Sequence, residues 1–464
     1  MDKLKVLILL PDGISLKNFA YSNFYKKALK SGFEACFWNA TPFELGDLGF
    51  NEVKLPKPKL YKLTDVYKTA RKHIELNIYR KKFSNTAFST YKFPFNYSTP
   101  KKAFKSALCR ALIFFNNSEK GLLKIRTKII QFERKTLYYK QCSDCLKANK
   151  PSILFCTNQR PVIAIAPITA AKDLGIPTAT FIFSWDNLPK ATMVVETDYY
   201  IVWSDYMKDE LLRYYPYIEE DKVYVTGTPQ FESIFGEHIT PKDAFFEQYK
   251  LDHSKKYICY SGDDVTTSPD DPQYLEDTAK ALRELNTRGH NLGLIFRRCP
   301  VDFSNRYDAV LENFKEVITP INPKWTKLNE QWDTILPKKE DLHLLKETVL
   351  HSEMVINLGS TMVFDYVIEN KPCAYINYDV ANKKLQDWSV KKIYKYLHFE
   401  SMPTKDCVVW LDNPKEIAQK LEQALTNNED HIKAASDWFK IINQHPVDEA
   451  SNNIVLAIKD IIKR

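Results

Sequence analysis

Residues 5–38 read KVLILLPDGISLKNFAYSNFYKKALKSGFEACFW, and this stretch decides the fold class. It opens with an apolar run at 5–10, which is followed by the loop signal Pro-Asp-Gly at 11–13. Apolar residues then recur at helical spacing over 16–31, and a second short apolar run follows at 34–38. Short buried strands that alternate with amphipathic helices indicate βαβ units and a parallel sheet.

The same alternation occupies most of the chain. Strand-like runs return at 152–156, 178–183, 199–203 and 223–226, and a second series lies at 257–261, 292–296, 354–357, 373–376 and 408–411. The polar stretch 236–255 between the two series is predicted as a linker. We therefore expect an α/β protein with two Rossmann-like domains, at 1–235 and 256–430, and C-terminal helices over 431–464. Such sheets bind ligands at the carboxyl ends of their strands, here in a cleft between the two domains.

The charge of the chain is distributed unevenly. The formal net charge is +8 over 464 residues, but residues 51–150 alone hold 24 basic and 6 acidic side chains. No convincing strand-like run occurs in this stretch, which is predicted as a basic helical insert in the N-terminal domain. A charge excess of this kind either meets an anionic partner or keeps the insert in solution.

One predicted helix of the insert has an apolar face formed by Phe104, Leu108, Ala111, Leu112 and Phe115. Such a helix can lie in an anionic membrane interface. The predicted membrane contacts are Lys101, Lys102, Phe104, Lys105 and Arg110. The alternative is a helical lobe with an aromatic core and a solvated basic face. Basic residues among aromatic ones also suit single-stranded nucleic acid, but no RNA-binding signature accompanies them and no nucleic-acid partner is expected.

The sequence also bounds the compartment. The five apolar residues at 6–10 are too few for a signal peptide or a membrane span, and no window of about 18 apolar residues occurs elsewhere. The nine cysteines are scattered, and the CxxC pair of Cys142 and Cys145 lacks further ligands for zinc. We expect reduced cytosolic thiols, a cytoplasmic protein, no metal and no cofactor.

Candidate ligand-binding residues follow the strand at 354–357. Gly359 allows a close approach of the backbone, and Ser360 and Thr361 supply hydroxyl groups at the start of a helix, where exposed N–H groups favour phosphate. Asp365 lies about one turn into that helix, so it could accept hydrogen bonds from a ribose or sugar diol. The alternative is an ordinary capped helix with an exposed aspartate.

Two further segments of the second series are candidates for the same site. Arg297 and Arg298 follow the strand at 292–296 and are predicted to point into one crevice, where a guanidinium group can bind a diphosphate. The alternative is one surface arginine and one structural ion pair. Ser261 and Gly262 suit a phosphate-facing loop, whereas Asp263 and Asp264 are expected at its rim.

The loop FSWDNLPK at 183–190 follows a strand of the first series. Trp185 offers a stacking face and Asn187 an amide, so both are predicted to contact an acceptor. Either Asp186 in this loop or Asp12, after the first strand, could act as a general base toward an acceptor hydroxyl. The alternative is a turn with a buried tryptophan. No GxGxxG, GxxxxGK[ST], HExxH or GxSxG motif occurs at the places that those chemistries require.

Taken together, several segments resemble the GT-B glycosyltransferases of bacterial surface-polysaccharide assembly, a group that includes the CDP-glycerol glycerophosphotransferases. The resembling segments are SWDNL at 184–188, YYIVWS at 199–204, VYVTGTPQF at 223–231, RRCP at 297–300 and GST at 359–361, with Asp365 and with Lys371 and Pro372. The resemblance implies a nucleotide-sugar donor on the C-terminal domain and an acceptor on the N-terminal one. It also implies metal-independent catalysis and a last helix that crosses back to the N-terminal domain.

The expected function is therefore transfer of a sugar from a nucleotide-sugar donor to a glycan or lipid-linked acceptor, at the inner face of the cytoplasmic membrane. Cys299 stands where many relatives have histidine. Asn357 and Asp365 stand where retaining relatives often carry two glutamates, which favours inversion. Alternatives are a CDP-glycerol-type glycerophosphotransferase, a non-catalytic scaffold and a UDP-sugar 2-epimerase-like enzyme, although the Gly-Thr-Arg-Pro segment of such epimerases is absent.

Overall fold

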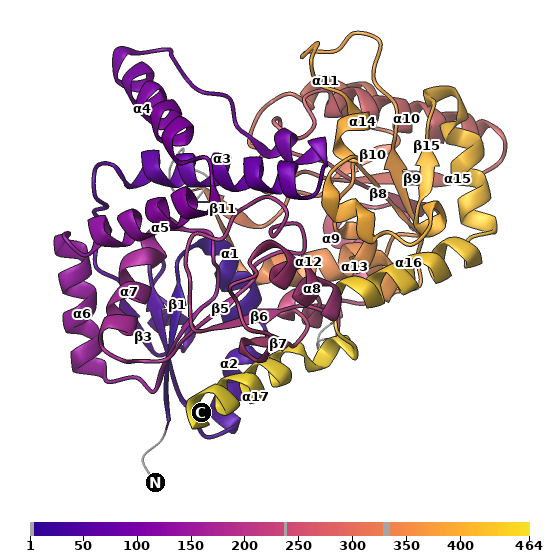
Figure 1. Ribbon diagram of the computed structural model, residues 1–464. Helices are drawn as coiled ribbons and strands as arrows, with labels where there is room; N and C mark the ends of the chain where they lie inside the picture. Colours follow the sequence, from indigo (N-terminus) through magenta and orange to yellow (C-terminus); the bar gives the residue numbers. More distant parts are fainter. Residues whose placement is uncertain (1–3, 236–238, 328–334) are drawn as a thin grey trace. The chain divides into compact units, whose positions relative to one another are not determined.

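The computed structural model describes residues 4–235, 239–327 and 335–464. The chain divides into two compact units (Figure 1). Unit 1 consists of Met1–Gln230 and Ile442–Arg464, and unit 2 consists of Phe231–Ile441. In the part of the chain that is described, none of the helices is long and apolar enough to cross a membrane.

A seven-stranded parallel sheet in the order β3-β2-β1-β4-β5-β6-β7 forms the centre of unit 1. Its strands are β1 (Lys5–Leu10), β2 (Glu34–Asn39), β3 (Glu52–Lys54), β4 (Ile153–Cys156), β5 (Thr178–Phe181), β6 (Tyr199–Val202) and β7 (Val223–Val225). The chain adds strands in one direction up to β3 and in the other from β4 on, so the order reverses between β1 and β4. Ligands of doubly wound sheets bind at such a reversal.

The short helices α1 (Gly13–Ser15) and α2 (Phe24–Lys30) and the longer α7 (Ile165–Asp173) and α8 (Asp205–Tyr214) connect these strands. They cover the sheet, which explains why the strand sequences are continuous apolar runs rather than alternating ones. Leu7, Leu9 and Trp38 are fully buried. The βαβ organisation expected from the sequence is confirmed.

The insert between β2 and β4 is mostly helical, apart from its first residues and the stretch 92–99. Its helices are α3 (Thr64–Lys82), α4 (Pro100–Asn116), α5 (Glu119–Glu133) and α6 (Leu137–Asn149). Strand β3 was not predicted from the sequence, because it is only three residues long, at 52–54, and lies at the sheet edge. Ile74, Ile129 and Leu146 of α3, α5 and α6 join the same hydrophobic cluster as Leu7 and Leu154 of the sheet. These three helices therefore belong to the core of unit 1.

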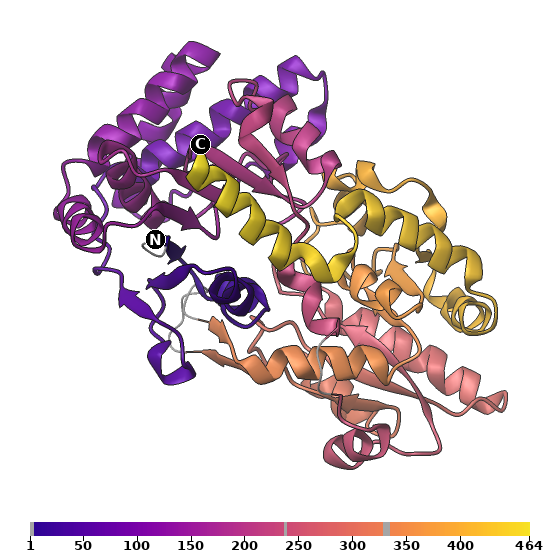
Figure 2. The same cartoon turned by 90° about the horizontal axis from the view of Figure 1, so that it is seen from below.

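The C-terminal helix α17 (Ala450–Lys463) packs against α2 of unit 1 (Figures 1 and 2). Asn443, before this helix, accepts a hydrogen bond from the backbone N–H of Thr228 at 2.9 Å. Asn453 on the helix donates to the carbonyl of Thr226 at 3.2 Å. Gly227 between them has φ +80°, and a Cβ there would lie 3.2 Å from Cβ of Ala450.

Unit 2 contains a six-stranded parallel sheet in the order β10-β9-β8-β13-β14-β15. The strands are β8 (Lys256–Ser261), β9 (Leu292–Arg297), β10 (Ile318–Pro320), β13 (Val355–Asn357), β14 (Cys373–Ile376) and β15 (Val409–Leu411). The order again reverses once, between β8 and β13. The principal helices are α10 (Asp271–Thr287), α12 (Lys339–Leu350), α13 (Met362–Ile368), α15 (Ile417–Thr426) and α16 (Glu429–Ile442), and a small antiparallel pair comprises β11 (Trp325–Lys327) and β12 (Ile335–Pro337).

Two boundaries differ from the sequence prediction. The predicted linker at 236–255 contains α9 (Lys242–Tyr249), whose Phe245 and Phe246 lie in a core cluster with Tyr257 and Leu344. This segment is thus part of unit 2, and residues 236–238 lie outside the described residues. Unit 2 also takes α16, and the chain returns to unit 1 at Ile442. Helical character was predicted for this polar stretch, but not the packing of its aromatic residues Phe245, Phe246 and Tyr249 into the core cluster.

We expect Gly227→Val to destabilise unit 1 more than Gly175→Val does. Both glycines have positive φ, +80° and +70°, so both substitutions carry backbone strain of roughly 1–3 kcal/mol. Only at Gly227 would the new side chain also collide with the segment that holds α17, which adds roughly 1–3 kcal/mol. Urea unfolding followed by tryptophan fluorescence measures both variants. An equal loss in the two would show that α17 does not depend on this contact.

Candidate functional site

The strand-order reversal of unit 1 carries a buried polar cluster. Asp12 follows β1, and its Oδ1 accepts hydrogen bonds from the backbone N–H and the hydroxyl of Ser15, both at 2.9 Å. Its Oδ2 accepts a hydrogen bond from Nδ2 of Asn158, which follows β4, at 2.6 Å. Asp12 therefore caps α1 and joins the two strands of the reversal. Both of its oxygens already have partners.

The next residue, Gln159, extends this cluster to the 183–190 loop. Its Nε2 donates to Oδ1 of Asn187 at 3.0 Å, and its Oε1 accepts from the backbone N–H of Phe183 at 2.9 Å. Asn187 in turn donates to Oδ1 of Asp186 at 2.7 Å. The other oxygen of Asp186 forms an ion pair with Lys190. The carboxylate keeps 24% of its side chain exposed, so it is the accessible acid of this cluster.

Several expectations for unit 1 need correction. Asp12 and Asp186 lie at the carboxyl ends of their strands as expected, but Trp185 and Asn187 are buried. They offer almost no surface to an acceptor, and the alternative of a turn with a buried tryptophan describes them better. Asn158 and Gln159 were missed, although the polar run TNQR directly after the strand at 152–156 was the available signal.

The strand-order reversal of unit 2 has a fixed loop after β13. Gly359 has φ +67°, and a Cβ there would lie 3.1 Å from Cζ of Phe399, so a larger residue would meet both strain and a clash. The backbone N–H of Ser360 donates to Oδ1 of Asn357 at 2.8 Å, and the hydroxyl of Tyr375 donates to the carbonyl of Ser360 at 2.9 Å. Ser360 and Thr361 stay half-exposed at the strand end.

Asp365 lies about one turn into a helix, as predicted, but it is less accessible than a ligand-binding carboxylate would be. It lies within α13 and is only 6% exposed. The carboxylate predicted to bind a diol is therefore buried, and the alternative of an exposed aspartate does not describe it either. Ser261 ends β8 and is half-buried. Gly262 is buried, and a Cβ on it would lie 3.0 Å from the ring of Phe296. Gly262 thus fills a packing position.

The two adjacent arginines at the end of β9, Arg297 within it and Arg298 after it, do not point into one crevice. Nη2 of Arg297 donates to both carboxylate oxygens of Asp341, at 3.0 and 2.9 Å, in a buried ion pair. Arg298 instead donates to the carbonyl of Ser304, and its guanidinium carbon lies 5.2 Å from the ring centre of Tyr307. Successive side chains of an extended chain leave in opposite directions, which explains the separation. Arg297 is the structural ion pair that the sequence analysis held as the alternative.

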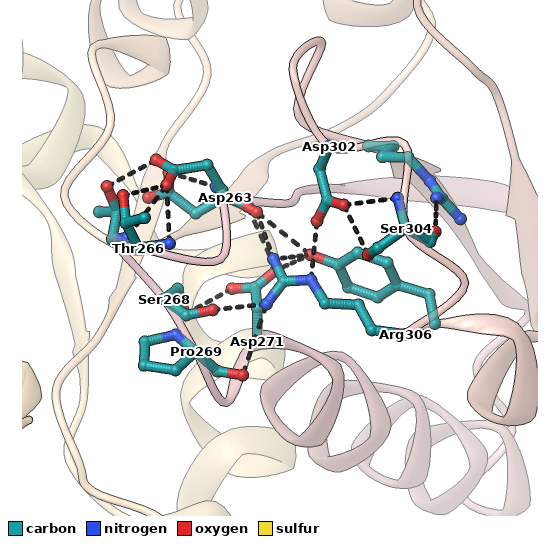
Figure 3. A network of polar contacts seen from close by, with 12 residues as sticks. Asp263, Thr266, Ser268, Pro269, Asp271, Asp302, Ser304 and Arg306 are labelled. Atoms are coloured by element: carbon teal, nitrogen blue, oxygen red, sulfur yellow. Dashed lines mark hydrogen bonds and ion pairs between the residues drawn. The ribbon is translucent and has the colours of Figure 1, made fainter. Parts of the chain in front are cut away.

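A network that the sequence did not suggest joins the loops after β8 and β9 (Figure 3). Asp271 begins α10 and accepts hydrogen bonds from the hydroxyls of Tyr307 at 2.7 Å and Ser268 at 2.9 Å. The backbone N–H of Asp263 also donates to it, at 3.2 Å. Asp271 therefore ties the first residues after β8 to the start of α10.

Arg306 is the cation of this network. Its Nε donates to Oδ2 of Asp302 at 2.7 Å, and its Nη1 donates to the carbonyl of Ser268 at 2.6 Å. Its Nη2 donates to the carbonyl of Asp263 and, at 2.8 Å, to the hydroxyl of Tyr307. Every donor nitrogen of the buried guanidinium thus holds one of the two loops at the carboxyl edge of the sheet.

The carboxylates of these loops titrate unequally. Desolvation raises the pKa of Asp263 well above its usual range, and the neighbouring charges of Asp271 and Asp264 raise it further. Desolvation also raises the pKa of Asp271, although hydrogen bonding from Tyr307 opposes it. The pKa of Asp264 is lowered, because hydrogen bonds from Thr266 and Thr267 outweigh its desolvation. The loop after β8 therefore carries less negative charge than its two adjacent aspartates suggest.

Comparison with known proteins shows the fold. No family model matches the sequence, and no curated protein matches it. A putative UDP-N-acetylglucosamine 2-epimerase from Listeria monocytogenes matches with TM-score 0.56 and 12% identity over 99% of this chain and 97% of that one. S. aureus MnaA, solved with UDP, matches with TM-score 0.54 and 13% identity over the same shares. A glycosyltransferase from Rickettsia africae matches with TM-score 0.52 and 11% identity over 100% of each chain.

These likenesses, together with two doubly wound sheets, give the chain a GT-B fold, which confirms the fold class expected from the sequence. Within the described residues, no group of three or more histidine, cysteine, aspartate or glutamate side chains is arranged to hold a metal ion.

Removal of the buried guanidinium of Arg306 should destabilise unit 2 strongly. Arg306→Ala removes the cation paired with Oδ2 of Asp302 and one of the donors to the carbonyl of Asp263, and loss of one member of a buried pair costs about 3–5 kcal/mol. Arg283→Ala is the control, because Arg283 pairs with Glu316 on the surface, where such pairs contribute about 0–1 kcal/mol. Urea unfolding compares the two. Similar small losses would mean that the network does not hold the loops together.

Asp263 should make stability depend on pH. Its folded-state pKa is raised, so the folded protein binds this proton more tightly than the unfolded chain. Stability from this group is therefore lost as the pH rises from about 4, the ordinary aspartate range, toward the raised pKa. Asp263→Asn removes the titration, so its unfolding midpoint should exceed that of the wild type near neutral pH. The difference should shrink toward pH of about 4.

Asp47→Asn provides the control for this experiment, since Asp47 is exposed in unit 1. Its unfolding midpoints should follow those of the wild type at every pH. If Asp263→Asn also follows the wild type throughout, the carboxyl of Asp263 does not titrate differently in the folded and unfolded states.

Proposed function

We propose that the protein is a glycosyltransferase that moves a sugar from a nucleotide-sugar donor to a hydroxyl of a glycan or lipid-linked acceptor. The observation that carries this proposal is a fixed polar cluster at the strand-order reversal of each sheet, where doubly wound sheets bind ligands. The fold supports it, because solved proteins of this fold include one described as a glycosyltransferase and one with bound UDP.

The donor would bind to unit 2, at the carboxyl ends of β8 and β13. Ser360 and Thr361 are half-exposed there, on a loop that Gly359 and Tyr375 hold in place. Ser261 lies at the end of the neighbouring strand. Arg298 would face the diphosphate, and Arg297 would support the site through Asp341.

The acceptor would bind to unit 1, with Asp186 as the general base. Its side chain is partly exposed, whereas that of Asp12 is buried. Asp186 would take the proton from the acceptor hydroxyl while that oxygen attacks the anomeric carbon. The bond from this carbon to the diphosphate oxygen breaks, and the nucleoside diphosphate leaves with the electron pair. One displacement of this kind inverts the anomeric centre.

Calorimetric titration with UDP-, GDP-, CDP- and CMP-sugars and with CDP-glycerol tests the donor site. We expect one nucleotide-sugar class to bind, and Arg298→Ala to weaken that binding roughly tenfold or more, as loss of a charged hydrogen bond does. Asp186→Asn should leave donor affinity unchanged but lower the transfer rate by about 100-fold or more, because only the base is lost.

Matched variants make the result specific. Arg288→Ala removes an equal charge from an exposed position of unit 2 and should not change donor affinity. A rate loss in Asp12→Asn but not in Asp186→Asn would move the base to Asp12. Binding of CDP-glycerol alone would point to glycerophosphotransfer, epimerisation of a UDP-sugar without acceptor would point to an epimerase, and absence of any binding would contradict the proposal.

A further inference from the structure

Helix α4 is the part of the insert with one face left unpacked. Thr99 caps its start by accepting a hydrogen bond from the backbone N–H of Lys102 at 3.3 Å. Ser106 and Cys109 are buried, and Cys109 packs in a small cluster with Val66 and Ala70 of α3. This packing fixes which side of α4 faces the rest of unit 1, and Figure 1 shows α4 lying against α3 with its other side free.

The free side carries large aromatic residues. Phe104, Phe114 and Phe115 are 71%, 80% and 78% exposed. At about 100° per residue, Phe104 and Phe115 lie on the same line of the helix, opposite the buried Cys109 and Ser106. Single exposed apolar residues are ordinary, but three phenylalanines on one helix form a patch of the kind that marks an interaction site.

The charges around this patch have one sign. Residues 92–118 contain five basic side chains and no acidic one. Round the helix from the line through Phe104 and Phe115, Lys101 and then Lys105 lie on one side, and Arg110 lies further away on the other side. Lys102 lies on the opposite face. All four are exposed, and none forms an ion pair with a carboxylate in the described part of the chain. Arg110 instead donates to the hydroxyl of Tyr97 at 3.3 Å.

We propose that α4 docks on an anionic lipid bilayer, with Phe104, Phe114 and Phe115 in the interfacial region and Lys101 and Arg110 against the headgroup phosphates. Exposed aromatic side chains between flanking cations are the pattern of helices that lie in the plane of a membrane surface. Charge complementarity favours an anionic bilayer over a second copy of the protein, because a second copy of α4 would bring like charges together. The docking does not depend on the transferase activity.

The structure also changes which residues form this surface. Leu108 and Leu112, which the sequence analysis placed on the membrane face, are partly buried against the neighbouring helix. Phe114, which it left out, is the most exposed of the three aromatic rings. Its ring meets that of Phe115 edge to face at 5.2 Å. The proposed contact surface is therefore narrower than the predicted apolar face and lies opposite α3.

Co-sedimentation of the full chain with extruded vesicles tests the proposal. Vesicles of phosphatidylcholine with phosphatidylglycerol should bind the protein, vesicles of phosphatidylcholine alone should bind it weakly, and added salt should weaken the binding. The double variant Phe104→Ser with Phe115→Ser should reduce binding to the anionic vesicles roughly tenfold or more. Lys101→Gln with Arg110→Gln should reduce it severalfold. All four positions are exposed, so thermal melting should stay unchanged.

The control variants carry the same changes at exposed positions elsewhere. Leu385→Ser with Leu456→Ser, both 55% exposed, and Lys415→Gln with Lys433→Gln should bind vesicles as the wild type does. Equal binding by the phenylalanine variant overturns the proposal and leaves only a solvated basic face. The proposal is also overturned if the wild type forms a dimer in sedimentation velocity and the phenylalanine variant is monomeric. It is likewise overturned if a single-stranded oligonucleotide competes with vesicles for the wild type and binds the phenylalanine variant more weakly.

Discussion

Burial of both faces of a parallel sheet is the constraint on which the rest of the structure depends. Once helices cover β1, β4, β8 and β13, no polar side chain can project from the middle of these strands without losing its water. Polar chemistry is thereby confined to the strand ends. In both units the polar clusters lie at the carboxyl ends, where the strand order reverses and the flanking loops diverge.

The loops at these ends are held by fixed polar contacts. In unit 1, Asp12 and Gln159 connect the first loop to the loop that carries Asp186. In unit 2, Arg306 and Asp271 do the same for the loops after β8 and β9. Many of the polar residues at each sheet edge thus hold the site in shape, and few remain accessible to a ligand. In this respect Asp186, which is partly exposed, differs from the buried Asp12, and Arg298 differs from Arg297, which is held in a buried ion pair.

The insert shows a similar division of roles. Its total charge and aromatic content gave no indication of which residues face inward. The structure places α3, α5 and α6 in the core cluster of the sheet, so most of the aromatic side chains of these helices pack inside unit 1. The exposed aromatic residues concentrate on α4, where the neighbouring charges are all basic. The fold thus determines that one face of α4 is buried against α3 while the other face remains unpacked.

The sequence by itself determined the fold class, because continuous apolar runs between amphipathic helices can be satisfied only by covered parallel strands. It also located the segments 11–13, 183–190 and 359–361, since a loop after a buried strand is visible in one dimension. The tertiary structure alone decided which side chains of these segments are accessible. Arg297 meets Asp341 over 44 residues of sequence, and Asp12 meets Asn158 over 146. Such pairings depend on strand order, which local patterns do not record.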